Sequence, residues 1–114
     1  MGMYHSTYFA YGLRIPLDVH PWTETDRIDA ELGAVKSQCP DVGHLSAGDY
    51  DRDMLFLVTQ SDEIALGEYG RAALATPEQR ADWDRQLRTA VDHLGYGHPQ
   101  DLEEPGWLCI PDLS

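Results

Sequence analysis

Three aspartates at alternate positions are the first residues whose spacing is typical of metal chemistry. Asp49, Asp51 and Asp53 match the opening ligands of a calcium-binding loop. The sixth position of such a loop needs a glycine but holds Met54, and the twelfth needs a bidentate glutamate but holds Gln60. A standard EF-hand is therefore excluded. Weak divalent-cation binding at a turn is the remaining metal hypothesis, against the simpler interpretation of a solvated acidic turn. No cofactor is expected.

The cysteines and histidines are the next candidates for chemistry. A cysteine nucleophile needs a histidine base, and His44 follows Cys39 closely in the sequence. Neither this spacing nor that of His93 and His98 matches a zinc motif. Cys39 and Cys109 are expected to stay reduced and to act as small hydrophobic residues. Because no phosphate loop, nucleophile elbow or zincin helix is present, the sequence supports no specific catalytic claim.

A group of aromatic residues near the N-terminus provides the ligand or interface candidates. Tyr4, His5 and Tyr8 lie in one strand-like segment, and His44 is the fourth residue of the set. Aromatic side chains with a polar tip are frequent at binding surfaces. The alternative is that these residues are ordinary core residues with high strand propensity. Both interpretations remain open from the sequence.

The acidity of the chain restricts its partners. Twenty carboxylates and eight basic side chains give a net charge of −12, and all of the excess follows residue 21. This charge repels the phosphates of nucleic acids and anionic membrane surfaces, so direct nucleic-acid binding is not expected. No apolar run approaches membrane-spanning length. A basic protein partner is favoured, and the alternative is that the charge only maintains solubility in the cytoplasm.

The first strand is the element that must position most of the candidate residues. Aromatic and apolar residues alternate over residues 3–15 and occupy both faces, which predicts a central strand. Gly12 is expected to mark a bulge or a close approach of two backbones. Phe9 and Tyr11 fall on one face with Leu13, whereas Tyr8 falls on the other face.

Two helices follow from their caps and periodicity. Thr23 or Thr25 is expected to cap the first helix, which ends over residues 37–40. The second helix has the clearest signal, because Thr76 precedes a proline and a glutamine in a capping-box arrangement. Gly95 is expected to end this helix. Its buried stripe is predicted to consist of Trp83, Leu87, Ala90, Val91 and Leu94.

Three further strands complete the pattern. A weak strand is expected over residues 42–49, a strong one over 54–59 and a short last one over 107–110. The acidic stretch 48–53 is typical of a hairpin turn. Residues 60–76 have no clear periodicity, although Ile64 and Leu66 can extend a strand or anchor a loop.

The element order predicts a single α+β domain over residues 1–114. The order β-α-β-β-α-β is that of the ferredoxin-like sandwich, a four-stranded, mainly antiparallel sheet with two helices on one face. The other face would then be open, with Tyr4 and Tyr8 on it.

Two function classes are compatible with the predicted fold and charge. The first is a non-enzymatic interaction or accessory protein, as a homodimer, whose acidic surface engages a basic partner. Such a protein would act as an inhibitor of its partner, and a more specific version of this hypothesis is a nucleic-acid mimic. The alternative is a small ligand-binding or enzymatic domain. Its pocket would lie between the open sheet face, the 60–76 segment and residues 96–105.

Overall fold

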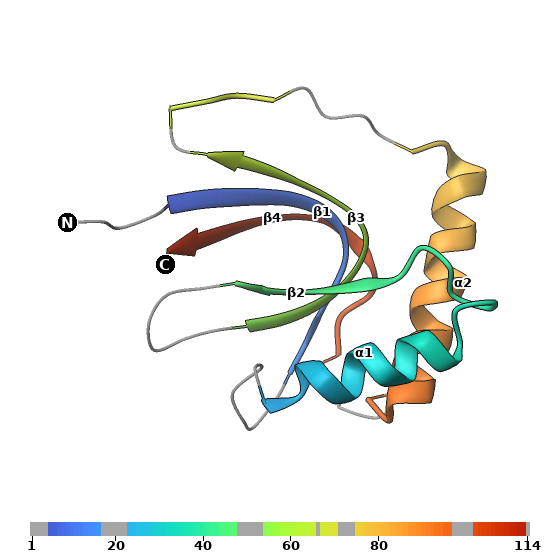
Figure 1. The fold of residues 1–114 in the computed structure, drawn as a ribbon. Coiled ribbons are helices and arrows are strands. Elements are labelled where there is room, and N and C mark those ends of the chain that lie inside the picture. The colour runs from blue at the N-terminus through green and yellow to red at the C-terminus, as the bar shows by residue number, and fades with distance from the viewer. Residues whose placement is uncertain are drawn as a thin grey trace.

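Alternating apolar residues in the strands and 3.6-residue periodicity in the helices produce the predicted order of six elements. The computed structural model describes residues 5–16, 23–47, 54–65, 67–70, 75–96 and 102–113. The chain has the α+β class expected from its sequence (Figure 1). Its elements are β1 His5–Ile15, α1 Thr25–Ala34, β2 Gly43–Ala47, β3 Met54–Ala65, α2 Pro77–Leu94 and β4 Gly106–Leu113.

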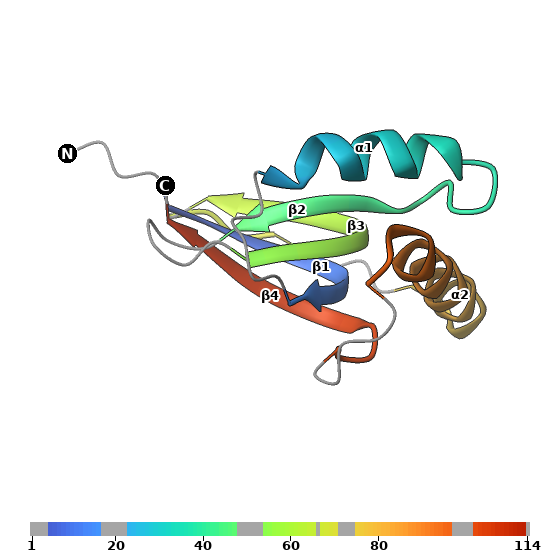
Figure 2. The ribbon, with the colours of Figure 1, turned by 90° about the horizontal axis from the view of Figure 1, so that it is seen from below.

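The four strands form one open antiparallel sheet in the order β2-β3-β1-β4 (Figures 1 and 2). β1 lies between β3 and β4, which agrees with the central position predicted for it. β3 in turn separates β1 from β2, the two strands that α1 connects. This arrangement is consistent with a ferredoxin-like layout.

A bulge divides β1 and β3 into two halves. The pairing runs from Tyr11 opposite Gln60 to Gly12 opposite Val58, which leaves Thr59 as the extra residue of β3. A Cβ atom at Gly12 would collide with the carbonyl oxygen of Leu57, so only glycine allows the two backbones to lie this close. Bulges increase the bend of a strand, and β1 and β3 curve sharply in Figure 1. The bulge and close approach predicted at Gly12 are both confirmed.

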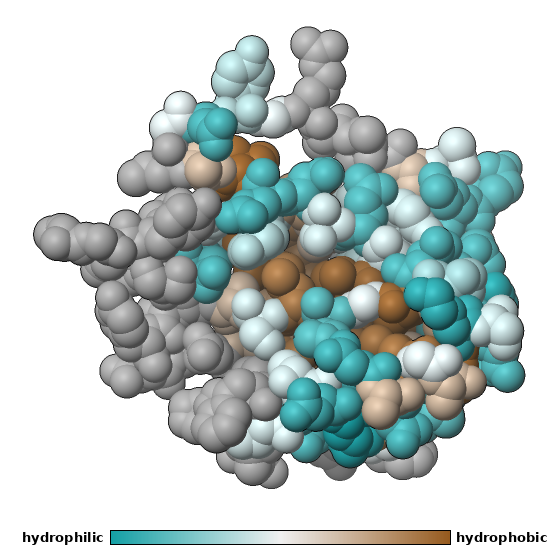
Figure 3. Space-filling model, viewed as in Figure 1, coloured by the Kyte–Doolittle hydropathy of each residue, from teal (hydrophilic) through white to brown (hydrophobic). Residues whose placement is uncertain are grey.

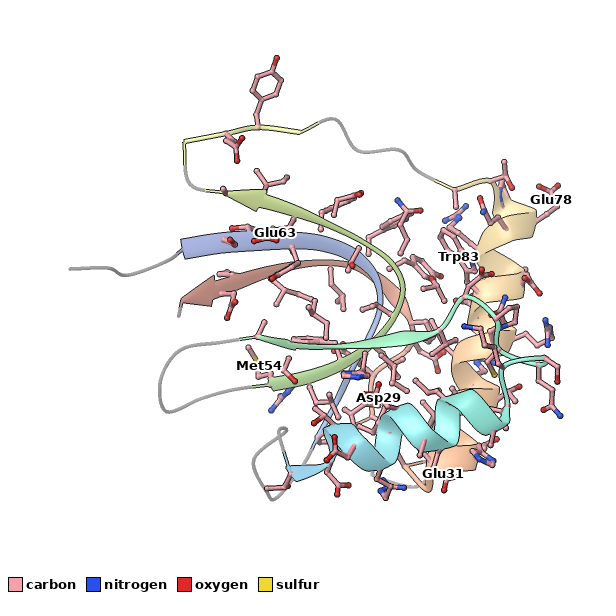
Figure 4. The ribbon with its side chains drawn as sticks, in the orientation of Figure 1. Asp29, Glu31, Met54, Glu63, Glu78 and Trp83 are labelled. Carbon is pink, nitrogen blue, oxygen red and sulfur yellow. The ribbon has the colours of Figure 1, made fainter. Side chains whose placement is uncertain are left out.

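The main core lies on one face of the sheet, beneath both helices. α2 covers the outside of the bend in Figure 1, and Trp83 extends from it toward the sheet in Figure 4. Burial of each large apolar side chain contributes about 1.5–3 kcal/mol, so this cluster dominates the stability of the domain. The residues that join the helices to this face include Tyr11, Leu13, Ile15, Ile28, Leu55, Leu57, Trp83, Leu87 and Val91.

The other face of the sheet carries a second, smaller apolar cluster. Ala10 from β1, Phe56 and Val58 from β3, and Ile110 from β4 are buried in it. Tyr8 packs against this cluster. The face opposite the helices is therefore apolar at its centre.

Residues 75–96 fold as the sequence predicts. Thr76 is the N-cap of α2, and its side-chain oxygen accepts a hydrogen bond from the backbone N–H of Gln79 at 3.2 Å. Pro77 occupies the first turn, and Gly95 ends the helix with a φ angle of 87°. The left-handed conformation at this position favours glycine because other residues carry a Cβ atom that crowds the backbone.

The cap predicted for α1 is wrong. The N-cap is Glu24 rather than Thr23 or Thr25, and the Glu24 side chain makes no capping hydrogen bond. The Glu24 carboxylate instead accepts hydrogen bonds from Arg27 at 3.1 Å and from the Tyr96 hydroxyl at 3.0 Å. Contacts with a residue after α2 have therefore replaced the local cap, which sequence spacing does not show.

The strand bounds differ from the prediction mainly at their C-terminal ends. β3 continues through residues 60–65 as the partner of β1, and β4 continues beyond Ile110 to Leu113. Pro111 fits within β4 opposite Thr7, because an edge strand needs hydrogen bonds on one side only. The turn predicted over residues 48–53 lies outside the described residues.

Candidate functional site

The side chains selected from the sequence lie on different faces of the sheet. Tyr8 packs against the apolar cluster of the face opposite the helices. His44 lies on the helix side, where its Nε2 is 2.6 Å from the carboxylate of Asp29. Asp29 lies on α1 (Figure 4). His5 begins β1 opposite Leu113, and its side chain lies outside the described atoms, as does all of Tyr4. The structure therefore does not bring Tyr8 and His44 into one site.

A metal centre has no support from the described part of the chain. No group of three or more histidine, cysteine, aspartate or glutamate side chains there is arranged to hold a metal ion. Asp49, Asp51 and Asp53 all lie outside the described residues, so weak cation binding by them stays a prediction.

Cys39 and His44 do line a common cleft between α1 and β2, with a volume of about 220 Å³. The Cys39 thiol is buried and donates a hydrogen bond to the carbonyl oxygen of Gln86 at 3.4 Å. Burial raises the pKa of this thiol, which disfavours the thiolate that nucleophilic chemistry requires. His44 is already paired with Asp29. The geometry favours a structural role for Cys39.

Residues 102–105 cover a second cavity, of about 230 Å³, beside α2. Two contacts hold this segment in place. The backbone N–H of Arg14 donates to the Glu103 carboxylate at 2.9 Å, and Arg88 pairs with Glu104 at 2.8 Å. Glu103 and Glu104 both line the cavity, so these contacts fix the segment against β1 and α2.

A third cavity, of about 420 Å³, lies on the outer half of the sheet beneath the segment that follows β3. We call it the acidic groove. It is formed on the helix-bearing face of β1, β3 and β4, at the end away from α2 (Figure 1). The residues that line it are Thr7, Phe9, Asp62, Glu63, Ile64, Glu68, Tyr69, Gly70 and Cys109.

The floor of the acidic groove is apolar. The Phe9 ring stacks on the Trp107 ring, with 5.3 Å between their centroids and 6° between their planes. On the two neighbouring strands, Cys109 lies opposite Phe9, and Ile64 lies opposite Thr7. Because Trp107 also packs against the main core, the floor is held rigidly from below. In Figure 3, hydrophobic residues are visible beneath the uppermost segment, with hydrophilic residues around them.

Carboxylates form the rim of the acidic groove. Glu63 accepts a hydrogen bond from the buried Ser6 hydroxyl at 2.7 Å, so its carboxylate is already engaged. The carboxylates of Asp62 and Glu68 make no hydrogen bond or ion pair with another described residue. Tyr69 extends above the rim with 95% of its surface exposed. Among the described residues, nothing pairs with these two carboxylates, and the Tyr69 ring is open to solvent.

Local backbone geometry explains how the rim is positioned. Gly67 has a φ angle of 87°, and the backbone N–H of Glu68 donates to the carbonyl oxygen of Ala65 at 3.0 Å. After this turn the chain runs back along the outer side of β3, as the uppermost segment in Figure 1 shows. Glu68 and Tyr69 then line the groove, and the Tyr69 ring extends into solvent.

The residues of this groove are not predictable from local sequence patterns. The turn glycines were visible in the sequence, but residues 60–65 did not read as a strand because they are mostly polar. The exposure of Tyr69 depends on the path of the chain after Gly67, which no local pattern specifies. Ile64 was the one signal, as an apolar residue able to extend a strand.

The arrangement suits a ligand that is both cationic and partly apolar. Asp62 and Glu68 supply negative charge, and the exposed ring of Tyr69 can bind a cation over its face. Phe9 and Ile64 can accept the aliphatic stem of an arginine or lysine side chain. Among the described residues that line the groove there is one thiol, Cys109, and no histidine, so none of them forms a nucleophile–base pair.

Comparisons with known proteins add no family to this description: no family model, curated protein or solved structure matches the chain. Among the described residues, neither helix combines the length and apolar character needed to cross a membrane.

Proposed function

We propose that the chain is a non-enzymatic interaction protein that binds a basic segment of a partner protein in the acidic groove. The observation that carries the proposal is the pairing of an apolar, rigid floor with carboxylates that have no described partner. An apolar floor of this kind gives contact area, and the rim gives charge selectivity.

The charge of the whole chain supports the same partner chemistry. A net charge of −12 attracts basic proteins over distances of about 8–10 Å at physiological salt and speeds their encounter. Direct nucleic-acid binding is opposed by the same charge. Two predictions extend this proposal. The first is that binding inhibits the partner, and the second, more specific one is that the chain does so by mimicking nucleic acid.

Titration with a basic peptide tests the proposal. The probe is a capped heptapeptide of alternating arginine and valine, and its matched control replaces each arginine with glutamate. We expect the arginine peptide alone to bind, and its affinity to fall as salt is raised, because salt screens exposed charges. Absence of binding, or binding that salt does not change, would overturn the proposal.

Charge variants locate the binding site. The double variant Asp62→Asn and Glu68→Gln removes the two rim carboxylates, and we expect binding of the arginine peptide to weaken about tenfold. The control is Asp26→Asn with Glu78→Gln, which removes the same charge from the exposed first turns of α1 and α2. Glu78 lies on α2 in Figure 4, away from the groove. Equal loss in both double variants would mean that binding follows net charge and not this site.

We also propose that the strand order β2-β3-β1-β4 belongs to the full ferredoxin-like topology, with both helices on one face. The shared core of α1, α2 and one sheet face supports this assignment. The homodimer expected from the sequence stays a prediction, and measurement of the molecular mass in solution decides it.

A further inference from the structure

An aromatic series runs from the main core to the floor of the acidic groove. Trp107 of β4 contacts the Trp83 ring of α2, with 6.3 Å between the centroids, and the Tyr11 ring of β1, with 5.0 Å. Both contacts are edge-on, at interplanar angles of 79° and 76°. Phe9 then stacks nearly parallel on Trp107. Because Trp107 is fixed by two rings of the core, it holds the plane of Phe9 in one orientation.

The stack leaves one side of the Phe9 ring turned toward the groove. Phe9 lines the acidic groove, whereas Trp107 is not among the described residues that line it. On β4, Cys109 lies opposite Phe9, and Trp107 lies two residues closer to the inner half of the sheet, opposite Tyr11. Trp107 therefore covers the inner side of the Phe9 ring, and the outer side borders the groove. A ligand in the groove meets a flat aromatic surface whose orientation is set before binding.

A carboxylate lies next to this flat surface. Asp62 of β3 is the cross-strand partner of Phe9, and both residues line the groove. Side chains at such directly paired positions have Cβ atoms about 4.5–5.5 Å apart. The Asp62 carboxylate makes no hydrogen bond or ion pair with another described residue. The groove thus places an aromatic plane and a carboxylate side by side.

This combination fits a guanidinium group better than an ammonium group. A guanidinium is planar, stacks on aromatic faces and forms two parallel hydrogen bonds with one carboxylate. The ammonium of lysine is a compact, strongly hydrated charge with no plane to stack. The groove volume of about 420 Å³ lies within the range of about 300–1,000 Å³ that is typical of ligand pockets, so it has room for an arginine side chain.

We propose that the acidic groove selects arginine over lysine, with the guanidinium stacked on the groove side of Phe9 and paired with the Asp62 carboxylate. The inference rests on the proposed function and adds the side chain that the groove recognises. Phe9 rather than Tyr69 determines the selectivity, because Trp107 holds the Phe9 ring in place, whereas the Tyr69 ring is 95% exposed. A surface that is ordered before binding loses less conformational entropy when the ligand arrives.

A lysine peptide separates this selectivity from general charge attraction. The alternating arginine–valine heptapeptide is compared by titration with the same peptide carrying lysine in place of each arginine, which keeps length and charge. We expect the arginine peptide to bind at least about fivefold more tightly, because stacking and paired hydrogen bonds add to the charge attraction. Equal affinity, or tighter binding of the lysine peptide, would overturn the inference while leaving the proposed function intact. Failure of both peptides to bind would remove the proposed function itself.

Substitutions of the two groove rings assign the selectivity to one of them. Phe9→Leu keeps an apolar floor but removes the plane, so the preference for the arginine peptide should disappear, whereas Phe9→Tyr keeps the ring and should keep the preference. Tyr69→Leu is the matched control and should also keep it. Persistence of the preference in Phe9→Leu, or its loss in Phe9→Tyr or Tyr69→Leu, would overturn the inference.

The two rim carboxylates are compared in the same way. Asp62→Asn removes the proposed partner of the guanidinium, so it should weaken binding of the arginine peptide at least about threefold more than binding of the lysine peptide. Glu68→Gln is the control, and it should weaken both peptides alike because it removes charge only. A reduced preference in Glu68→Gln with an unchanged one in Asp62→Asn would overturn the pairing with Asp62.

Discussion

The two halves of the sheet differ in what covers their helix-bearing face. In the inner half, Leu13 and Leu57 are buried beneath α2 and are almost inaccessible to solvent. In the outer half, Phe9 and Ile64 are only partly buried and form the floor of a cavity. The same two strands thus contribute to the stability of the domain at one end and to a binding surface at the other. Substitutions in the inner half should lower stability, and those in the outer half should lower binding.

Leu57→Ala is expected to have the largest effect. Leu57 is fully buried, and removing its side chain leaves a cavity between the sheet and α2, which costs about 2–5 kcal/mol of unfolding free energy. Ile64→Ala is the matched variant in the outer half and should cost less than about 1 kcal/mol. Urea denaturation of both variants measures the difference, and equal losses would contradict the division into two halves.

Gly12→Ala tests the boundary between the halves. The added Cβ atom would collide with the backbone of Leu57 and Val58, so the two strands must separate, at a cost of about 1–3 kcal/mol. Gly43→Ala is the control, because a Cβ atom at that position meets no atom within 4 Å. Thermal unfolding compares the two. If Gly12→Ala unfolds no earlier than Gly43→Ala, the close approach does not constrain the sheet.

Tyr11→Phe tests how firmly α2 is held on the inner half. The Tyr11 hydroxyl donates to the Asp84 carboxylate at 2.6 Å, and its loss should cost about 1–2 kcal/mol near neutral pH. Burial and this hydrogen bond raise the pKa of Tyr11 from 10.0 to about 12. The proton is therefore held more tightly in the folded state. The stabilisation is complete below about pH 10 and is lost as the pH rises toward 12.

Urea denaturation at neutral pH and at about pH 11 checks this dependence. The variant Tyr11→Phe should lose less stability over that interval than the unchanged chain. Tyr69→Phe is the control, because that side chain is 95% exposed and should leave the pH dependence unchanged. A similar alkaline loss in Tyr11→Phe and in the unchanged chain would show that other groups cause it.

Thr76→Ala has the smallest expected effect. It removes the side-chain cap of α2 and should cost about 1 kcal/mol of unfolding free energy. Thr89→Ala, in the same helix, is the control and should have a smaller effect. Because α2 covers the inner half, binding of the arginine peptide should stay the same in Thr76→Ala. A change in that affinity would show that the two halves are coupled.

Local signals explain which parts of the fold were predictable. The cap at Thr76, the proline after it and the stop at Gly95 act within one helical turn of their own positions, so the bounds of α2 were found from the sequence. The contact between Glu24 and Tyr96 at the start of α1 was not predictable, because the two residues lie far apart in the sequence. The candidate site was missed for a similar reason, since its floor and rim come from three strands and a loop.

The extra residue at Thr59 has a consequence for how the two ends of β3 present their side chains. Before it, the odd-numbered Leu55 and Leu57 point toward the helices; after it, the even-numbered Asp62 and Ile64 occupy that side. At the bulge, the residues of β3 that face the helix side therefore change from odd-numbered to even-numbered. Without it, Asp62 would face the opposite cluster, and Glu63 would take its place on the helix-bearing face. One inserted residue therefore decides which carboxylate an incoming ligand would meet.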